Sequence, residues 1–211
     1  MNSFFNLEGP LISALDKFGR IIILNVLWLL CCLPIITIGA STTAFYYGMA
    51  KTIRHERSSA PKEFFKCFKR VLKNSLVPTI LFVVALAVLI VDALVWSAKN
   101  TGVGLISSHL CVILAVILVC VGIYFVAVQS RFLYSTKELI KFSAFLAMKH
   151  LPYTILMLLM AVLALFLTAM FPVFGIFVPG IACMGISYFM ENVFKKYIPK
   201  PEEGEEVWYD E

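Results

Sequence analysis

Two ionisable residues lie near the same end of the first clear helical hairpin that the sequence predicts. Asp92 lies near the end of an apolar helix predicted over residues 76–96, and His109 lies near the start of the next one, over 104–129. Because the connection between these helices is short, the carboxylate and the imidazole can meet near one membrane surface. Such a pair can relay a proton or contact a ligand, or it can bridge the two helices. Asp92 and His109 are therefore a candidate polar site whose role stays open.

No other group of residues in the sequence matches a known catalytic or metal-binding motif. The six cysteines form no CxxC pair, and five of them lie in apolar runs, which is typical of packing residues. The sequence contains no glycine-rich phosphate loop, no HExxH motif and no paired nucleophile and base. We therefore expect a protein that is not an enzyme and that uses neither a cofactor nor a metal.

The composition indicates an integral membrane protein. Of the 211 residues, 61% are hydrophobic and 15% are charged, whereas soluble domains have about 45–50% and 25%. The apolar residues form runs of about 20, which is the length that crosses a ~30 Å hydrocarbon core. The clearest runs cover residues 76–96, 104–129, 152–170 and 175–190. Pro179 falls inside the last run and predicts a kink there.

The basic residues predict the orientation of the chain. Of the 18 Lys and Arg residues, eight lie within residues 51–73, four within 131–149 and three within 195–200. By the positive-inside rule these segments are cytoplasmic, and both termini are expected on that side. Anionic membrane lipids explain the basic charge more simply than nucleic acid, which is not an expected partner. Glu191 is expected to pair with Lys195 or to lie at a lipid-facing surface.

An amphipathic basic segment precedes each of the two clearest hairpins. Over residues 61–78 and 137–152, apolar side chains recur at helical spacing and lysines take the other faces. Both segments are expected to lie on the cytoplasmic surface with their apolar face in the lipid boundary, and residues 9–20 resemble a third such helix. We therefore predict one transmembrane domain, residues 1–198, with a weak repeat of surface helix plus hairpin over 9–54, 61–130 and 135–194.

The stretch from residue 20 to residue 54 must be a hairpin if both of its ends are cytoplasmic. Its 35 residues give about 52 Å of helix, which is short of two crossings of a ~30 Å core. A shallow hairpin gives six crossings in all, and a single kinked span with the N-terminus outside gives five. The predicted fold is therefore an all-α integral membrane protein with five to six membrane helices, arranged as hairpins preceded by amphipathic cytoplasmic surface helices.

The bend of this first hairpin is expected between Pro34 and Gly39, and small residues follow it. Small side chains let helix backbones approach closely, either within one chain or against a partner. The candidate packing or partner face consists of Pro34, Gly39, Ser41, Thr42, Thr43 and Ala44.

The last residues of the chain, 199–211, form an acidic tail. Six acidic residues together with Pro and Gly predict a flexible cytoplasmic segment. Trp208 and Tyr209 are its candidate anchors if the tail becomes ordered on a partner.

The N-terminal third carries a family resemblance. The words "LNVLWLLCCLPIITIGASTTAFYY" and "EFFKCFKR" resemble the YesL family of small bacterial membrane proteins, and the likeness extends more loosely over nearly the whole chain. The resemblance implies a multi-pass protein of the bacterial cell membrane. Members are often encoded beside carbohydrate ABC importers, so it also implies partnership with the permease and ATPase subunits of such an importer.

Three functions are consistent with these observations. The first is a non-enzymatic accessory or regulatory subunit that docks on a carbohydrate ABC importer. The chain lacks the coupling motif of importer permeases, so it is not expected to be the permease itself. The second is a small independent transporter or channel built around Asn25, Asp92, His109 and Gln129. The third, a membrane-bound enzyme or sensor, has no nucleophile and base to support it.

Overall fold

The computed structural model describes residues 10–54, 59–99, 101–132 and 134–197. It is 92% helical, and its described residues contain no strand, which confirms the all-α prediction. The seven α-helices are α1 (Pro10–Cys32), α2 (Ile38–Gly48), α3 (Ala60–Ala98), α4 (Gly102–Arg131), α5 (Thr136–Lys149), α6 (Leu151–Met170) and α7 (Val178–Phe194). Short helical turns lie at Ile35–Thr37 (η1), Met49–Arg54 (η2, a π-helical turn) and Pro172–Ile176 (η3).

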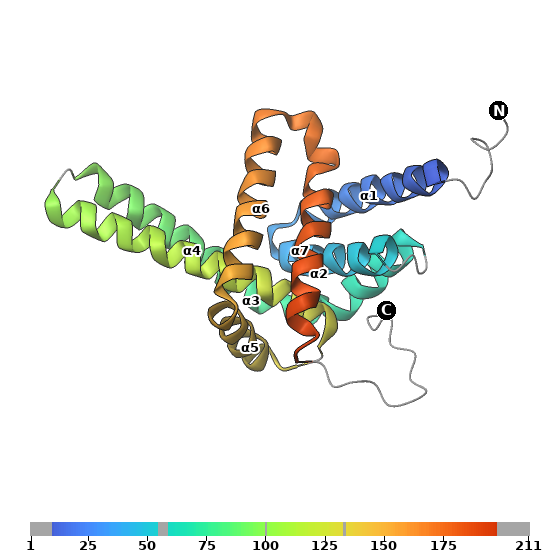
Figure 1. The fold of residues 1–211 in the computed structure, drawn as a ribbon. Coiled ribbons are helices and arrows are strands. Elements are labelled where there is room, and N and C mark those ends of the chain that lie inside the picture. Colours follow the sequence, from blue (N-terminus) through green and yellow to red (C-terminus); the bar gives the residue numbers. More distant parts are fainter. Residues whose placement is uncertain (1–9, 55–58, 100, 133, 198–211) are drawn as a thin grey trace.

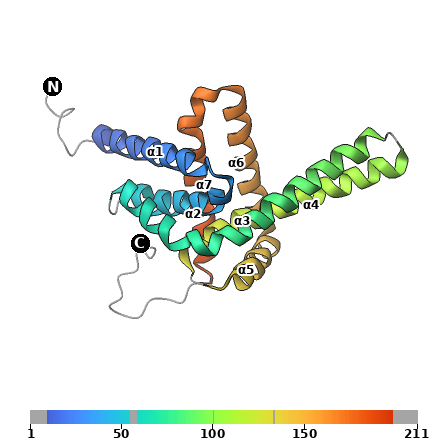
Figure 2. The ribbon, with the colours of Figure 1, turned by 180° about the vertical axis from the view of Figure 1, so that it is seen from behind.

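The helices radiate from a common centre (Figure 1). The α3–α4 hairpin extends to one side, the α6–α7 hairpin points in a second direction, and α1 points in a third, while α5 closes the base. Seen from behind, the same arrangement holds (Figure 2). We use "hub" for the contacting central segments, namely residues 21–25, 39–53, 60–79, 121–131, 139–147 and 187–194, and "arm" for residues 80–117.

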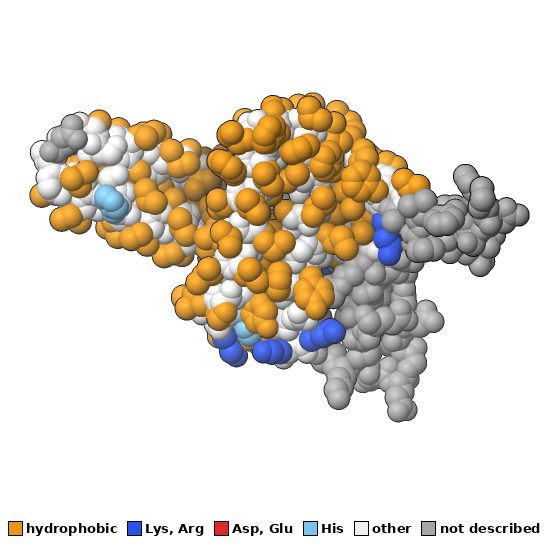
Figure 3. Space-filling view, turned by 45° about the horizontal axis from the view of Figure 1, so that its top comes forward, with side chains coloured by type: hydrophobic (Ala, Val, Ile, Leu, Met, Phe, Trp, Pro, Cys, Tyr) orange, Lys and Arg blue, Asp and Glu red, His pale blue; other side chains and the backbone are white. Residues whose placement is uncertain are grey.

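Apolar side chains cover most of the face of the two hairpins that Figure 3 shows. Among the described residues of the arm, only Gly104 and Ser108 are buried. Lysine and arginine side chains gather along the lower edge in the same view, near α5 and the end of α7. An apolar surface of this extent with a basic edge is the pattern of a protein embedded in a bilayer.

Three described helices are long and apolar enough to cross a membrane, namely α3, α4 and α6. This is fewer than the predicted five to six. The α2 helix has 11 residues, which is about 16 Å, and the six-residue π-helical turn η2 follows it directly. The α7 helix has 17 residues, or about 25 Å. In α1, Asp16, Lys17 and Arg20 precede the apolar stretch and leave it short. The predicted number of membrane-spanning helices is too high because it included hairpin helices whose apolar stretch is too short to span.

The basic segment over residues 61–78 is not a separate surface helix. It forms one continuous 39-residue helix with the span that follows, so α3 runs through Pro78. Proline removes one backbone hydrogen bond and commonly bends a helix without ending it. Figure 2 shows α3 bending between its teal first part and its green second part. Only the third predicted unit has a separate amphipathic helix, which is α5.

Protein covers the centre of the apolar face of both amphipathic segments, which corrects the prediction that these whole faces lie in the lipid boundary, although Phe65 and Ile140 at their margins are exposed. In the first part of α3, Phe64, Cys67 and Val71 are buried and belong to a core that α1 and α2 complete. In α5, Leu139 and Leu146 are buried in a second core together with side chains of α4, α6 and α7. The spacing shows correctly that these faces are apolar, but it does not show what covers them.

The predicted turn of the first hairpin is confirmed. α1 ends at Cys32 and α2 begins at Ile38, and the Thr37 hydroxyl donates to the Cys31 carbonyl oxygen over 2.6 Å. The returning helix lies against α1, because the Trp28 indole Nε1–H donates to Thr42 Oγ1 over 3.2 Å. Pro34 lies in this exposed turn with φ −76° and ψ 117°.

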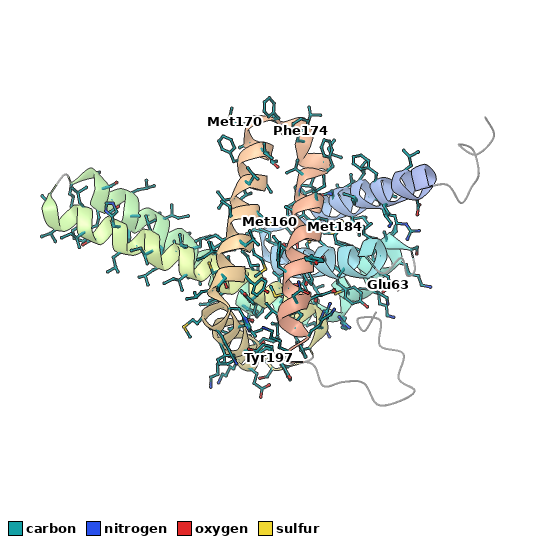
Figure 4. All side chains as sticks on the ribbon, in the orientation of Figure 1. Glu63, Met160, Met170, Phe174, Met184 and Tyr197 are labelled. Carbon is teal, nitrogen blue, oxygen red and sulfur yellow. The ribbon has the colours of Figure 1, made fainter. Side chains whose placement is uncertain are left out.

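The α6–α7 hairpin follows its predicted limits closely except around Pro179. α7 begins at Val178, so Pro179 lies in its first turn, where the missing N–H has no intrahelical partner to lose. The predicted kink at this residue is therefore not needed. Figure 4 shows Met160 and Met184 at similar heights on the two legs, and Gly185 lets the Met160 side chain lie against the α7 backbone.

Candidate functional site

A buried hydrogen-bond cluster joins three helices inside the hub. Gln129 of α4 is 4% exposed. Its Oε1 accepts hydrogen bonds from the hydroxyl of Thr43 in α2 (3.0 Å) and from that of Ser75 in α3 (2.8 Å). Its Nε2 is buried and has no hydrogen-bond partner among the described residues. The amide therefore ties α2, α3 and α4 together and keeps an unused donor.

Close packing between α2 and α3 makes this cluster possible. A Cβ added at Gly39 would collide with Thr79 Oγ1 and would lie 3.2 Å from Thr79 Cβ. Glycine at this position lets the α2 backbone approach α3, as small residues do at membrane helix interfaces. Ser75 lies one helical turn before Thr79, so the same close approach brings Ser75 within reach of Gln129.

The predicted small-residue face lies mostly inside the molecule. Ser41, Thr43 and Ala44 are buried, whereas Gly39 and Thr42 are partly buried and Pro34 is exposed. Ser41 Oγ donates to the Trp28 carbonyl oxygen over 3.1 Å. The described contacts of this face are therefore helix packing within the chain.

An ion pair with almost no exposure joins α4 to α7. The Arg131 Nη2 atom lies 2.7 Å from Glu191 Oε1, and each side chain is 4% exposed. The guanidinium carbon also lies 5.2 Å from the centre of the Phe194 ring. The Glu191 carboxylate thus pairs with Arg131 where Lys195 was the expected partner. Glu191 is 3% exposed, so it does not lie at a lipid-facing surface.

A second ion pair joins η2 to the start of α3. Lys51 Nζ lies 3.1 Å from Glu63 Oε2, with side-chain exposures of 15% and 5%, and it donates to the Tyr47 hydroxyl over 3.3 Å. Glu63 lies on the first part of α3 (Figure 4). The pair fixes the chain after α2 against the start of α3.

The structure does not join Asp92 to His109. Both side chains are exposed on the arm, and the His109 Nδ1 atom bonds to the Leu105 carbonyl oxygen of its own helix over 2.7 Å. The two helices are instead linked by Ser108, whose hydroxyl donates to the Ala93 carbonyl oxygen over 3.0 Å. No hydrogen bond or ion pair between Asp92 and His109 exists in the described structure, although the residues adjoin this link.

Asn25 lies in the hub region of α1 and is fully buried. Its Nδ2 donates to the Ile21 carbonyl oxygen over 2.9 Å, while its Oδ1 has no hydrogen-bond partner in the described segments. Gly180 of α7 packs directly against the Asn25 amide. Asn25 is therefore a packing contact between α1 and α7.

The remaining candidates give no further site. Trp208 and Tyr209 lie outside the described residues. Within the described ranges, no group of three or more His, Cys, Asp and Glu side chains could hold a metal ion.

Sequence reasoning named Gln129 but missed Ser75, Arg131 and Glu63. Ser75 continues the buried positions Phe64, Cys67 and Val71 of α3, so its place in the helical period was an available signal. The partner of Glu191 had no such signal, because Arg131 lies 60 residues away in the sequence.

His150 joins the end of α5 to the end of α7. Its Nε2 and the Tyr197 hydroxyl oxygen are 2.9 Å apart, and Figure 4 shows Tyr197 beside α5 at the base. Burial, followed by the Lys196 and Lys149 ammonium groups, lowers the pKa of His150 from its ordinary value of 6.5. The folded protein therefore favours the neutral imidazole.

This lowered pKa predicts a pH-dependent stability. The unfolded chain binds the proton more readily, so the contribution of His150 is complete above about pH 6.5 and is lost as the pH falls toward the lowered folded pKa. We expect the Tm of the wild type to fall more steeply than that of His150→Gln when the pH is lowered from about 7.5 to about 5. Thermal unfolding of both proteins in one detergent across this pH range measures the change of Tm with pH. Equal slopes of Tm against pH for the two proteins would contradict the prediction.

The comparisons with known proteins assign no activity to this site. Residues 21–93 match the family described as "Protein of unknown function, DUF624", a segment that includes the first hairpin and most of α3. No curated protein matches the chain, and no solved structure matches it. The match covers about a third of the 211 residues, so the chain is similar to that family over this segment.

Proposed function

We propose that the protein is a non-enzymatic accessory subunit of a bacterial carbohydrate ABC importer and that it docks on the importer's permease. The observation that supports this most directly is the arm. It projects from the hub as two apolar helices (Figure 1), and only 6% of the most apolar stretch of α3 is buried. The YesL-like resemblance suggests which partner occupies the same membrane.

Contacts between α3 and α4 hold the two helices of the arm together. Ser108 links its two helices through the Ala93 carbonyl oxygen, and Gly122 lies against the Phe82 ring near its base. At its far end, the Lys99 ammonium lies 4.0 Å from the centre of the Trp96 ring, and aromatic rings favour the membrane interface. A rigid apolar hairpin of this kind can pack against transmembrane helices of a permease.

The polar groups of the hub support a structural role. The side-chain oxygens of Gln129 and Glu191 are engaged with Thr43, Ser75 and Arg131. These contacts hold the hairpins in fixed relative positions, which is what a docking scaffold requires.

The alternative, an independent transporter, needs polar residues that line one path. Asn25 and Gln129 lie at the hub, whereas Asp92 lies 17 residues beyond Ser75 on α3, which is about 25 Å of helix. The four residues named for this function are thus divided between two distant places. Substrate flux through proteoliposomes that contain this chain alone would favour the transporter.

Co-purification from native membranes tests the proposal. We expect a tagged full-length chain at native expression to recover importer permease and ATPase subunits in mild detergent. Ile113→Trp, at a 56% exposed arm position, is expected to reduce recovery several-fold by steric interference. Leu159→Trp, at a 62% exposed position on α6, is the matched control and is expected to leave recovery unchanged.

Two results would contradict the proposal. Failure to recover any importer subunit across several mild detergents would remove the importer as partner. Equal recovery with both tryptophan variants would show that the arm is not the docking surface.

A further inference from the structure

A small recess opens at the basic side of the hub, where the first part of α3 meets the end of α4 and the start of α5. Of its lining residues, the exposed Arg70 and Asn74 form the rim and the buried Val71, Gln129 and Leu139 form the floor, while Phe132 and Tyr134 complete the lining. Its enclosed volume is about 10 Å³, the size of one water molecule. A larger group must therefore be held at the mouth of the recess.

The recess gathers hydrogen-bond donors that the described protein leaves unused. Arg70 is exposed, and its Nη2 is anchored by the Ser130 carbonyl oxygen over 2.7 Å and contacts Cys67 Sγ. Its Nε and Nη1 make no hydrogen bond to the described residues, and neither does the Asn74 side chain. At the floor, the 96% buried Gln129 also has a free donor, Nε2.

The guanidinium is held in place although it is exposed. Its central carbon lies 5.3 Å from the centre of the Tyr47 ring, and together with the Ser130 bond this fixes its plane. A fixed guanidinium with free N–H groups matches the oxygens of a phosphate group. No acidic residue lines the recess, so the positive charge there is not cancelled locally.

An apolar stripe leads from the recess along α3. Arg70, Asn74, Val77 and Leu81 follow one another at spacings of three and four residues, which places them on one helix face. Val77 is 71% exposed and Leu81 is 62% exposed, and both belong to the apolar part of the helix. The face thus presents donors at its basic end and a hydrocarbon-compatible surface beyond them.

We propose that this recess binds the phosphate group of an anionic membrane lipid, with Arg70 and Asn74 donating to the phosphate oxygens and the acyl chains lying along Val77 and Leu81. Headgroup sites of this type occur in basic pockets between membrane helices. The apolar stripe favours a lipid over free inorganic phosphate, because only the lipid uses both ends of the face.

Native mass spectrometry of the full chain in detergent, titrated with dioleoyl-phosphatidylglycerol, tests this assignment. We expect Arg70→Gln to weaken lipid binding about ten-fold, the loss of one charge-assisted contact. The neighbouring Lys69→Gln removes the same charge from an exposed position that does not line the recess, and it should bind like the wild type. Circular dichroism and Tm show whether each variant is folded.

A second variant keeps the test decisive if Arg70→Gln is destabilised. Asn74→Leu leaves Arg70 and its Ser130 bond in place, and we expect it to weaken lipid binding about three-fold. Equal losses in the Arg70 and Lys69 variants, or no loss in Asn74→Leu, would overturn the site. Inorganic phosphate that binds as tightly as the lipid and displaces it would assign the recess to free phosphate and overturn the lipid assignment.

Discussion

Glu191→Leu is expected to lower the free energy of unfolding by about 3 to 5 kcal/mol, because it leaves the Arg131 guanidinium charged and buried without its carboxylate. The two side chains are each 4% exposed and lie 2.7 Å apart. Solvation therefore cannot replace the lost partner. The substitution should also weaken the packing of α7 against α4, since this ion pair joins the two helices. Reversible unfolding in mixed detergent micelles measures the loss.

A double variant distinguishes the lost charge from the lost packing. Arg131→Met with Glu191→Leu removes both charges and keeps the volumes similar, so it should recover most of the stability that Glu191→Leu loses. Asp16→Asn is the control, because Asp16 and Arg20 form an exposed pair within one helix, where the expected cost is below about 1 kcal/mol. Similar costs for Glu191→Leu and Asp16→Asn would contradict the importance of the buried pair.

Local features of the fold could be predicted from the sequence where a residue type dictates the backbone. Proline and the small residues after Cys32 correctly indicated the turn between α1 and α2. Charge and hydropathy correctly indicated the ends of α6 and the turn between α3 and α4 to within a few residues, but they placed the start of α3 too late in the sequence. Each of these features depends on neighbours in the sequence, which is the information that a sequence pattern contains.

Features that depend on distant neighbours could not be predicted in this way. Helical spacing identified the apolar face around Phe64 and Val71, but whether lipid or protein covers it depends on where α2 lies. The predicted number of membrane-spanning helices was wrong for a related reason, since a helix such as α2 is apolar yet has only 11 residues. An apolar helix that is buried in protein and one that faces lipid have similar composition.

The residues of the candidate site also differ in whether the sequence alone could identify them. Gln129 was recognisable because a polar side chain in an apolar helix is costly and needs a partner. Its partners Thr43 and Ser75 come from 86 and 54 residues away, and no local pattern pairs them. The hub cluster therefore depends on how α2, α3 and α4 pack, and Gly39 lies at a close contact between α2 and α3.

Gly39→Ala is accordingly expected to destabilise the protein by about 1 to 3 kcal/mol, the usual cost of overpacking. The added methyl would collide with Thr79 Oγ1, and Thr79 lies one turn from Ser75, so the shift would also strain the bonds to Gln129. Removing the obstructing group should help, and Gly39→Ala combined with Thr79→Ala is expected to be more stable than Gly39→Ala alone. Unfolding in mixed micelles measures both.

Gly19→Ala is the matched control for the Gly39 substitution. Gly19 lies inside α1, and a Cβ added there meets nothing within 4 Å. The substitution is therefore expected to stabilise the helix by about 0.5 to 1 kcal/mol, since alanine is the better helix former. Opposite signs at the two glycines would assign the cost at Gly39 to the contact between α2 and α3. A gain in stability at both positions would show that α2 has room to move and that the hub does not depend on this close approach.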